Sequence, residues 1–365
     1  MAEKRKELMW RADLTGSGEG AKGKKGKKKE KKGEERMPKE IKKIKDQVTC
    51  NIDSPLHTQT YSTASAFSSC GFDNSFDLEE FKKNFKIDIH HKSDEEMVFD
   101  LVGIDTPIAN AIRRILLSEV PAMAFEQIYI RNNTSVLVDE VLSHRIGLLP
   151  IQADPRFFHF RGSEPQTDAN TIEFELCVSC PKGQKEKKIY SGDLVWHPLG
   201  SQEEDFESTP IKMVHDDILL AILGPGQEIH LTARAEKGVG EDHVKFSPVC
   251  TAFYRILPEI SLNVDIEDEL AEELVEKCPM RVFDIEDLGK TKKKAVVSRP
   301  RNCTVCRECI REPEWQPRID ISRNKQHFIF TIESTGALAP ELIFHMALKV
   351  FLEKLEVIKK GFLAL

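Results

Sequence analysis

Long hydrophobic runs are absent from this 365-residue sequence. No charge-free apolar stretch approaches the roughly twenty residues of a membrane-spanning helix, so we expect no contact with a membrane. The chain is charged from Glu3 to Lys6 and lacks the apolar segment of a secretory signal, so we expect no such signal. We therefore place the nine cysteines in a reducing compartment, where clustered cysteines favour metal binding over disulfides.

Motifs that carry catalysis are also missing. The sequence has neither a Walker phosphate-binding loop nor the G-x-S-x-G turn of serine hydrolases. It also lacks a run of carboxylates suited to a catalytic magnesium site. His215, Asp216 and Asp217 resemble an acid–base group, but we interpret them as caps of a helix predicted at 218–223. The sequence therefore predicts a protein that is not an enzyme.

Charge is distributed unevenly along the chain. The net charge is −7, but residues 1–45 hold 17 Lys/Arg against 8 Asp/Glu, which leaves −16 for the remainder. An acidic body argues against base-specific contact with DNA and favours protein partners. We predict that residues 1–80 form a disordered basic tail followed by an extended segment. The tail has three interpretations: a nuclear import signal, a loose nucleic-acid contact or a solvated tail.

The stretch from Asp105 to Ile151 carries the clearest helical pattern. Asp105 suits a helix cap, Pro107 a first turn, and Pro121 a helix end. Apolar residues then recur at helical spacing and predict a core face: Ile108, Ile112, Ile115 and Leu116. The opposite side bears arginines and predicts a docking surface: Asn110, Arg113, Arg114 and Leu117. Alternatively, one arginine bridges groups within its own domain.

The two ends of the ordered region differ in pattern. Order is expected from Phe81, and strands are predicted at 85–89 and 97–102. After Asp154 many short strands alternate with turns, which is typical of a mostly-β domain. In the final predicted helix, 340–360, apolar residues cover about 200° of the circumference, whereas packing on one core requires about 100°. We expect this helix to contact its own sheet and a second subunit; the alternative is burial in one large core.

Several long segments resemble one protein family. NAIRRILLSEVPAMAFE, DEVLSHRIGLLPI and HFIFTIESTGALAPE resemble the alpha and alpha-like subunits of multisubunit DNA-dependent RNA polymerases. The resemblance extends from about Phe81 to the end of the chain. FSPVCTAFYRILPEI and VHDDILLAILGPGQEI are most similar to the larger alpha-like subunit shared by RNA polymerases I and III. The polymerase II counterpart usually has tryptophan where Phe246 stands.

The resemblance implies an α+β fold and a non-catalytic role in assembly. It implies a discontinuous dimerisation domain, 81–151 plus 323–365, and an inserted mostly-β domain, 152–322, with a ferredoxin-like cysteine segment at about 262–322. The implied partners are a small alpha-like subunit in a heterodimer, the second-largest subunit, and other polymerase I and III subunits. Catalysis belongs to the two largest subunits of such enzymes. The implied location is the nucleus and nucleolus.

The resemblance also implies two contact surfaces. The helix 107–120 and the loop around His144 and Arg145 are expected to dock on the second-largest subunit. The final helix is expected to supply the dimerisation contacts, with five residues as candidates: Leu342, Met346, Val350, Phe351 and Leu355.

Four cysteines form the candidate metal site. Cys303, Cys306 and Cys309 have C-x₂-C-x₂-C spacing, and Pro313 stands where a single ferredoxin run would place a fourth cysteine. Cys278, followed by proline as in ferredoxin runs, is the candidate fourth ligand. The set would suit a [4Fe-4S] or [3Fe-4S] cluster or zinc, or it holds no metal. Two alternative functions stay open here: an iron–sulfur electron carrier or redox sensor, and the equivalent polymerase II subunit.

Overall fold

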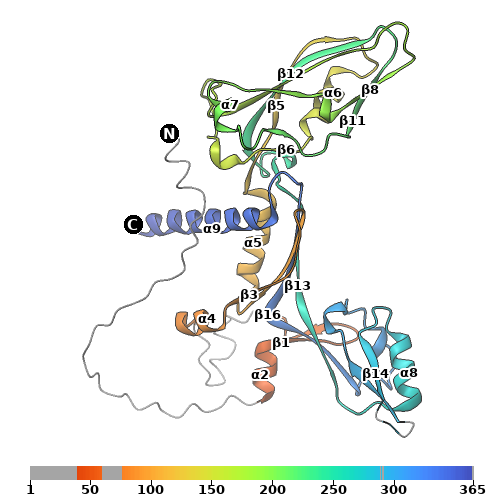
Figure 1. Cartoon of the computed structure of the whole chain (residues 1–365). Coiled ribbons are helices and arrows are strands. Elements are labelled where there is room, and N and C mark those ends of the chain that lie inside the picture. The colour runs from red at the N-terminus through yellow and green to blue at the C-terminus, as the bar shows by residue number, and fades with distance from the viewer. Residues whose placement is uncertain (1–38, 60–75, 288, 290–291, 364–365) are drawn as a thin grey trace.

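A computed structural model describes residues 39–59, 76–287, 289 and 292–363 of the chain. These residues form three units, each around its own hydrophobic cluster. The central unit lies between the other two, as Figure 1 shows. Most of the predicted basic tail and part of the predicted extended segment lie outside the described residues. Among the described residues, no helix has the length and apolar character needed to cross a membrane.

The central unit is built on a six-stranded antiparallel sheet. Five strands pair in the order β2 (Pro55–Leu56), β1 (Gln47–Cys50), β16 (Ile319–Ser334), β4 (Glu96–Val102) and β3 (Lys86–Lys92). Strands β4 and β1 pair with successive stretches of one edge of β16, and the sixth strand, β13 (Val249–Leu262), pairs with its opposite edge. Two helices pack on one face, α5 (Thr106–Ser118) and α9 (Pro340–Leu363). Two shorter helices lead into strands, α2 (Lys39–Asp46) and α4 (Leu78–Asn84). The helix α2 differs from the disorder predicted for this part of the tail.

Local sequence explains where α5 begins and which face it buries. The Asp105 side chain accepts a hydrogen bond from the Thr106 N–H at 2.8 Å, and Pro107 follows in the first turn. The helix ends at Ser118, before Pro121, as predicted. Its buried residues are Ala109, Ile112, Ile115 and Leu116, so the predicted core face is confirmed.

Aromatic side chains join α9 to the sheet. Phe99 of β4 stacks on Phe330 of β16 with ring centroids 5.5 Å apart. Phe344 of α9 meets the edge of Phe99 at 4.8 Å. Burial of an aromatic side chain contributes about 1.5–3 kcal/mol, so these contacts hold the first half of α9 on the sheet.

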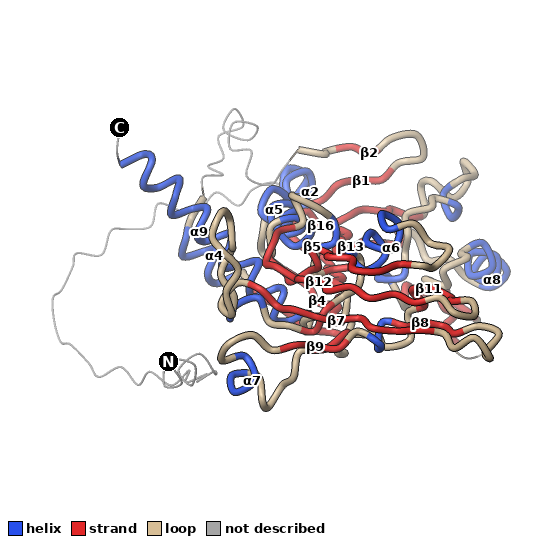
Figure 2. The backbone as a smooth tube through the Cα atoms, turned by 90° about the horizontal axis from the view of Figure 1, so that it is seen from above, coloured by secondary structure: helices blue, strands red, loops and turns tan. Residues whose placement is uncertain are grey.

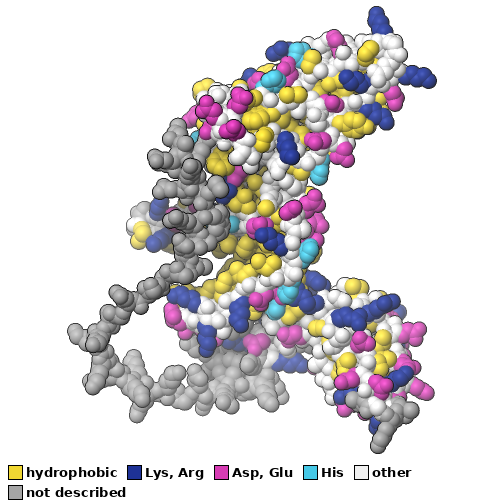
Figure 3. All heavy atoms as spheres, in the orientation of Figure 1, with side chains coloured by type: hydrophobic (Ala, Val, Ile, Leu, Met, Phe, Trp, Pro, Cys, Tyr) yellow, Lys and Arg dark blue, Asp and Glu magenta, His cyan; other side chains and the backbone are white. Residues whose placement is uncertain are grey.

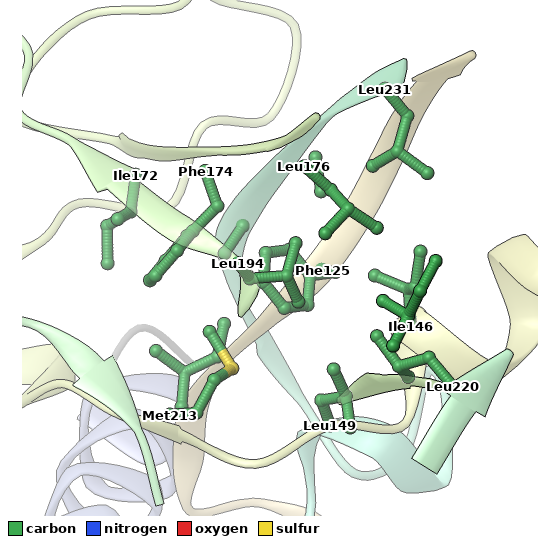
Figure 4. Packing of buried hydrophobic residues seen from close by; sticks show 14 of the residues in the cluster. Phe125, Ile146, Leu149, Ile172, Phe174, Leu176, Leu194, Met213, Leu220 and Leu231 are labelled. Atoms are coloured by element: carbon green, nitrogen blue, oxygen red, sulfur yellow. The ribbon is translucent and has the colours of Figure 1, made fainter. Parts of the chain in front are cut away.

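The second unit is mostly β and follows α5 directly. Its four-stranded sheet has the order β5 (Pro121–Asn133), β12 (Glu228–Val239), β7 (Thr171–Ser179) and β9 (Val195–His197). The helices α6 (Asp139–Gly147) and α7 (Gln202–Asp205) accompany it, with the strand pairs β6 (Ile151–Gln152)/β10 (Lys212–Met213) and β8 (Lys187–Tyr190)/β11 (Leu219–Leu223). Figure 4 shows the packed core, where Phe125 of β5 lies between Phe174 of β7 on one side and Ile146 of α6 on the other.

The three hydrophobic cores do not follow the predicted domain bounds, 81–151 plus 323–365 and 152–322. Those bounds stay a prediction. Residues of β5 and α6 belong to the core of the mostly-β unit, because β5 pairs with β12 along its length. Strand β13 belongs to the central sheet, because it pairs with β16. The helix predicted at 218–223 was wrong: Leu219–Leu223 is strand β11, paired with β8. A short apolar run does not by itself distinguish a strand from a helix.

The third unit contains the cysteine cluster. It consists of α8 (Asp268–Lys277), a hairpin of β14 (Phe283–Asp287) and β15 (Lys293–Val297), and two 3₁₀ turns, η4 (Pro300–Asn302) and η5 (Glu308–Ile310). Its core also takes in Cys50 of β1 and the Ile319 end of β16. The ferredoxin-like character predicted for this segment stays a prediction. We call it the cysteine unit below.

Candidate functional site

The second half of α9 carries apolar side chains that the described residues do not cover. Its first half is packed on the sheet through Ile343, Met346 and Ala347. Beyond Phe351 every described side chain is exposed, including Leu352 at 61%, Ile358 at 54% and Phe362 at 74%. Figures 1 and 2 both show this half extending away from the strands. So large an exposed apolar surface indicates an interaction site.

The predicted dimerisation residues divide between core and surface. Met346 is buried in the chain's own core, and Leu342, Val350 and Phe351 pack partly against it. Leu355 alone among the five is exposed. Leu352, Ile358 and Phe362 were missed, although their spacing carried a signal. Counting from Phe351, the steps to Leu355, Ile358 and Phe362 are four, seven and eleven residues, which places all four on one side of a helix.

A second apolar surface lies on the same side of the sheet. Ile87 and Ile89 of β3 are aligned with Leu101 and Phe99 of β4, so they share the face that α5 and α9 cover. Both isoleucines are nevertheless exposed, Ile89 at 60%. Hydrophobic side chains are visible in Figure 3 on the side of the molecule where α9 and α4 lie. The exposed half of α9 and this part of β3 can therefore contact one partner.

The docking residues predicted on α5 differ in how free they are. Arg113 donates from Nε and Nη2 to Asn110 Oδ1 at 3.2 and 3.0 Å, so these two side chains bind each other. Leu117 packs on the central core. The Arg114 side chain is exposed, and no described residue forms an ion pair with it. Arg114 is thus the residue of this surface with an available guanidinium.

The docking residues predicted on α6 belong to the mostly-β unit. Helix α6 packs on the core of that unit, whereas α5 packs on the core of the central unit. Arg145 Nε donates to the Leu220 carbonyl oxygen at 3.2 Å and Nη2 donates to that of Leu219, so this arginine joins α6 to β11. His144 is exposed and lines a cavity with Leu148, His243 and Lys245. Sequence reasoning missed the exposed apolar side chains beside it: Val138, Val141 and Leu148.

The four predicted cysteines line one small apolar pocket. Cys278 and Cys309 are buried, Cys303 is half-buried and Cys306 is exposed. The N–H groups of Val282 and Val305 donate to Cys278 Sγ at 3.4 Å and Cys303 Sγ at 3.3 Å. Val305 and Arg307 have φ values of 56° and 67°, a left-handed conformation that is uncommon for such residues. The loop is therefore shaped to turn its thiols toward the pocket.

The surroundings of Cys303 and Cys309 raise the pKa of both thiols and so favour their neutral form. Burial raises the pKa of Cys309 to about 12, and the neighbouring thiols of Cys303, Cys278 and Cys306 add to the effect. Burial also raises the pKa of Cys303. Within the described part of the chain, no set of three or more Cys, His, Asp or Glu side chains is arranged to hold a metal. The four thiols are thus suitable metal ligands by their chemistry, but their side chains are not placed to bind one ion together.

A buried carboxylate joins the cysteine unit to the central sheet. Asp100 of β4 is 3% exposed and accepts from Arg301 Nη1 and Nη2 at 2.6 and 2.9 Å. His327 Nε2 and His90 Nε2 lie 2.7 and 3.1 Å from Asp100 Oδ2. Burial alone raises the pKa of Asp100, but hydrogen bonds from Arg301, His327 and His90 outweigh it and hold that pKa well below its usual range. We call these four residues the Asp100 cluster.

These features define a subunit that is completed by other chains. The exposed half of α9 is an apolar surface of the kind that a partner covers. The comparisons with known proteins agree with this class. Residues 98–355 match the family model described as the RNA polymerase Rpb3/Rpb11 dimerisation domain. The chain therefore belongs to the family of RNA polymerase alpha-like subunits.

Relatives from polymerases I and III are more similar to the chain than one from polymerase II. It is 48% identical to DNA-directed RNA polymerases I and III subunit rpac1 of Dictyostelium discoideum over 81% of this chain and 87% of the relative. It is 44% identical to the human subunit RPAC1 over 78% and 86%. Identity to RNA polymerase II subunit rpb3 of Dictyostelium discoideum is 33% over 76% and 95%. The resemblance deduced from the sequence is confirmed.

The lowered pKa of Asp100 makes a prediction about acid stability. A carboxyl whose pKa is lower in the folded state stabilises the fold fully above its unfolded pKa, about 3.9, and loses that contribution as pH falls toward the folded pKa. We therefore expect the free energy of unfolding of the wild type to exceed that of Asp100→Asn at about pH 5, which is above the unfolded pKa. This difference should shrink below about pH 4 in urea denaturation.

The matched control is Asp284→Asn, because Asp284 forms an exposed ion pair with Arg299 that solvent screens. Its difference from the wild type should stay small at every pH. A difference for Asp100→Asn that did not change down to pH 3.5 would contradict the assignment.

Proposed function

We propose that this chain is a non-catalytic assembly subunit of DNA-directed RNA polymerases I and III. The observation that carries the proposal is the exposed apolar half of α9 in a chain of the dimerisation family. The identities of 41–48% to polymerase I and III subunits, against 33% for a polymerase II subunit, favour these two enzymes. The corresponding location is the nucleus, including the nucleolus, and the basic residues of the tail suit an import signal.

The heterodimer forms first in this proposal. A small alpha-like subunit covers the exposed half of α9 together with Ile87 and Ile89 of β3. Lys354 Nζ binds both carboxylate oxygens of Glu119 at 2.6 and 2.8 Å, which fixes the direction of α9 relative to the end of α5. The partner therefore meets a helix whose direction is already set, which lowers the ordering cost of association.

The second-largest subunit then docks on the surfaces of α5 and α6. Arg114 offers a free guanidinium, which binds carboxylates and carbonyls through several donors. The exposed Val138, Val141 and Leu148 around α6 supply apolar area, with His144 at their edge. Arg145 acts within its own unit by holding α6 on β11. Other subunits of the two polymerases complete the assembly.

The cysteine unit holds a metal in this proposal, either zinc or an iron–sulfur cluster. Cys278, Cys303, Cys306 and Cys309 would bind it as thiolates, and the metal would cross-link the loop to the end of α8. The two N–H···S hydrogen bonds support this role because they stabilise negative charge on sulfur. The role is structural. An electron-carrier function would require a reversible change in visible absorbance on reduction.

Charges introduced on α9 are expected to abolish the heterodimer. We predict that Leu355→Glu with Ile358→Glu lowers the affinity for the small alpha-like subunit at least about 100-fold, because two unpaired charges would be buried. Both positions are exposed in this chain, so folding should be retained. Co-purification after co-expression measures the effect. Glu356→Lys, on the polar side of the helix, is the control, and equal recovery of both variants would contradict the proposal.

Reversal of charge at Arg114 tests the second contact. We expect Arg114→Glu to weaken capture of the second-largest subunit about tenfold or more while the heterodimer stays intact, because Arg114 lies on α5 away from the exposed half of α9. Arg131→Glu, also at an exposed arginine but on β5, is the comparison. Loss of the heterodimer in Arg114→Glu, or normal capture of the large subunit, would contradict this docking surface.

Metal analysis tests the cysteine site. Anaerobically purified full-length protein is expected to contain one zinc ion or one cluster per chain, and Cys303→Ser should remove it. Iron, acid-labile sulfide and zinc are measured on the same sample. Cys177→Ser, at an exposed cysteine of the mostly-β unit, should leave the metal content unchanged. Absence of all three from the wild type would exclude the metal.

A further inference from the structure

Asp100 lies on the polar face of the central sheet. Its neighbours Phe99 and Leu101 point into the core beneath α5 and α9, so Asp100 points to the opposite face. There it is covered by Arg301, which comes from the turn η4 in the cysteine unit. Its other partners, His90 and His327, lie on the strands that flank β4. One carboxylate therefore binds three strands of the sheet to a loop 201 residues away.

Arg301 precedes three of the four cysteines in the same loop. Cys303 is the first residue after η4, and Cys306 and Cys309 follow it in the chain. Arg307 Nη1 of the same loop donates to the carbonyl oxygen of Ile52, which lies between β1 and β2, at 2.6 Å. The position of the thiols thus depends on contacts with residues outside their own unit.

The pair of Asp100 and Arg301 is suited to fixing a position. A guanidinium that binds a carboxylate through two parallel hydrogen bonds has a narrow choice of geometries. Removal of Arg301 leaves the buried Asp100 with only His327 and His90 as partners, which is unfavourable. Arg299 is a different case, because it pairs with Asp284 inside the cysteine unit at an exposed site.

We propose that Asp100 and Arg301 are positioning residues for the cysteine site, holding the loop of Cys303, Cys306 and Cys309 against the central sheet. Asp100 of β4 then controls two properties of the loop, the accessibility of its thiols and its affinity for a metal. The inference deepens the proposed cysteine site. It rests on that site only where a metal is the probe, because the reactivity of the thiols can be measured without one.

The test follows thiol labelling in metal-free, full-length protein. A maleimide is added, and the rate at each cysteine is read by peptide mass spectrometry. We expect Arg301→Met and Asp100→Asn to accelerate labelling of Cys303 and Cys309 at least about tenfold, since these thiols are shielded only while the loop is held. Arg299→Met is the matched control, an arginine two residues away, and should label at the wild-type rate. Equal rates for Arg301→Met and the control would overturn the proposal.

Two further measurements separate positioning from general destabilisation. Cys180 is buried in the core of the mostly-β unit and should keep its slow labelling in every variant. An equal rise at Cys180 and Cys303 would overturn the local role. The double variant Asp100→Leu with Arg301→Met should still label faster than the wild type, because apolar contact does not fix the position of the loop. Labelling of the double variant at the wild-type rate would overturn the directional role. Where Arg301→Met does not fold, Arg301→Lys keeps the charge and is expected to give an intermediate rate.

Zinc alone, titrated into the metal-free protein, provides the second readout. We expect the affinity to fall about tenfold or more in Asp100→Asn and to be unchanged in Arg299→Met, as for residues that orient ligands without binding the metal. Wild type that takes up no zinc, iron or sulfide contradicts the proposed metal site, and the labelling rates still decide the positioning role. Wild type and Asp100→Asn that bind zinc equally well contradict the positioning role alone.

Discussion

The pairing of β16 on both of its edges is the constraint on which the three-unit arrangement depends. Along one edge β16 pairs with β13 over most of its length, and along the other with β4 and then β1. Phe328, Phe330 and Ile332 at one end enter the central core, while Ile319 and Ile321 at the other end enter the core of the cysteine unit. One continuous strand therefore belongs to two cores, so the two units cannot separate without breaking its ladder.

The same sheet explains why a partner is needed. Two helices cover one face, but α9 is longer than the sheet beneath it, and its second half extends beyond the last buried contact at Ala347. The described part of the chain leaves Ile87 and Ile89 exposed on the same face. Exposure of both apolar surfaces to water is unfavourable, and one additional helix or sheet face could cover both at once. In the proposed heterodimer, the partner completes a core that the described part of this chain leaves open.

Local signals in the sequence were sufficient for some elements and not for others. Asp105, Pro107 and Pro121 set the ends of α5, because capping and proline geometry act within a few residues. The membership of β5 in the mostly-β unit could not be read locally, because it follows from pairing with β12 about a hundred residues later. Arg145 is similar: the family resemblance implies a docking role, but its side chain donates to the carbonyl oxygens of β11.

The Asp100 cluster is the site that sequence patterns could least reveal, and its chemistry shows what it adds. Asp100 and Arg301 lie 201 residues apart, and neither sits in a recognisable motif. Apolar side chains of similar volume would bury the same area and often stabilise a fold as well or better. They would also let η4 slide on β4, since apolar contact is not directional. Two parallel hydrogen bonds, with histidines on the flanking strands, allow one position. The cluster therefore specifies where the cysteine loop lies on the sheet more than it stabilises the chain.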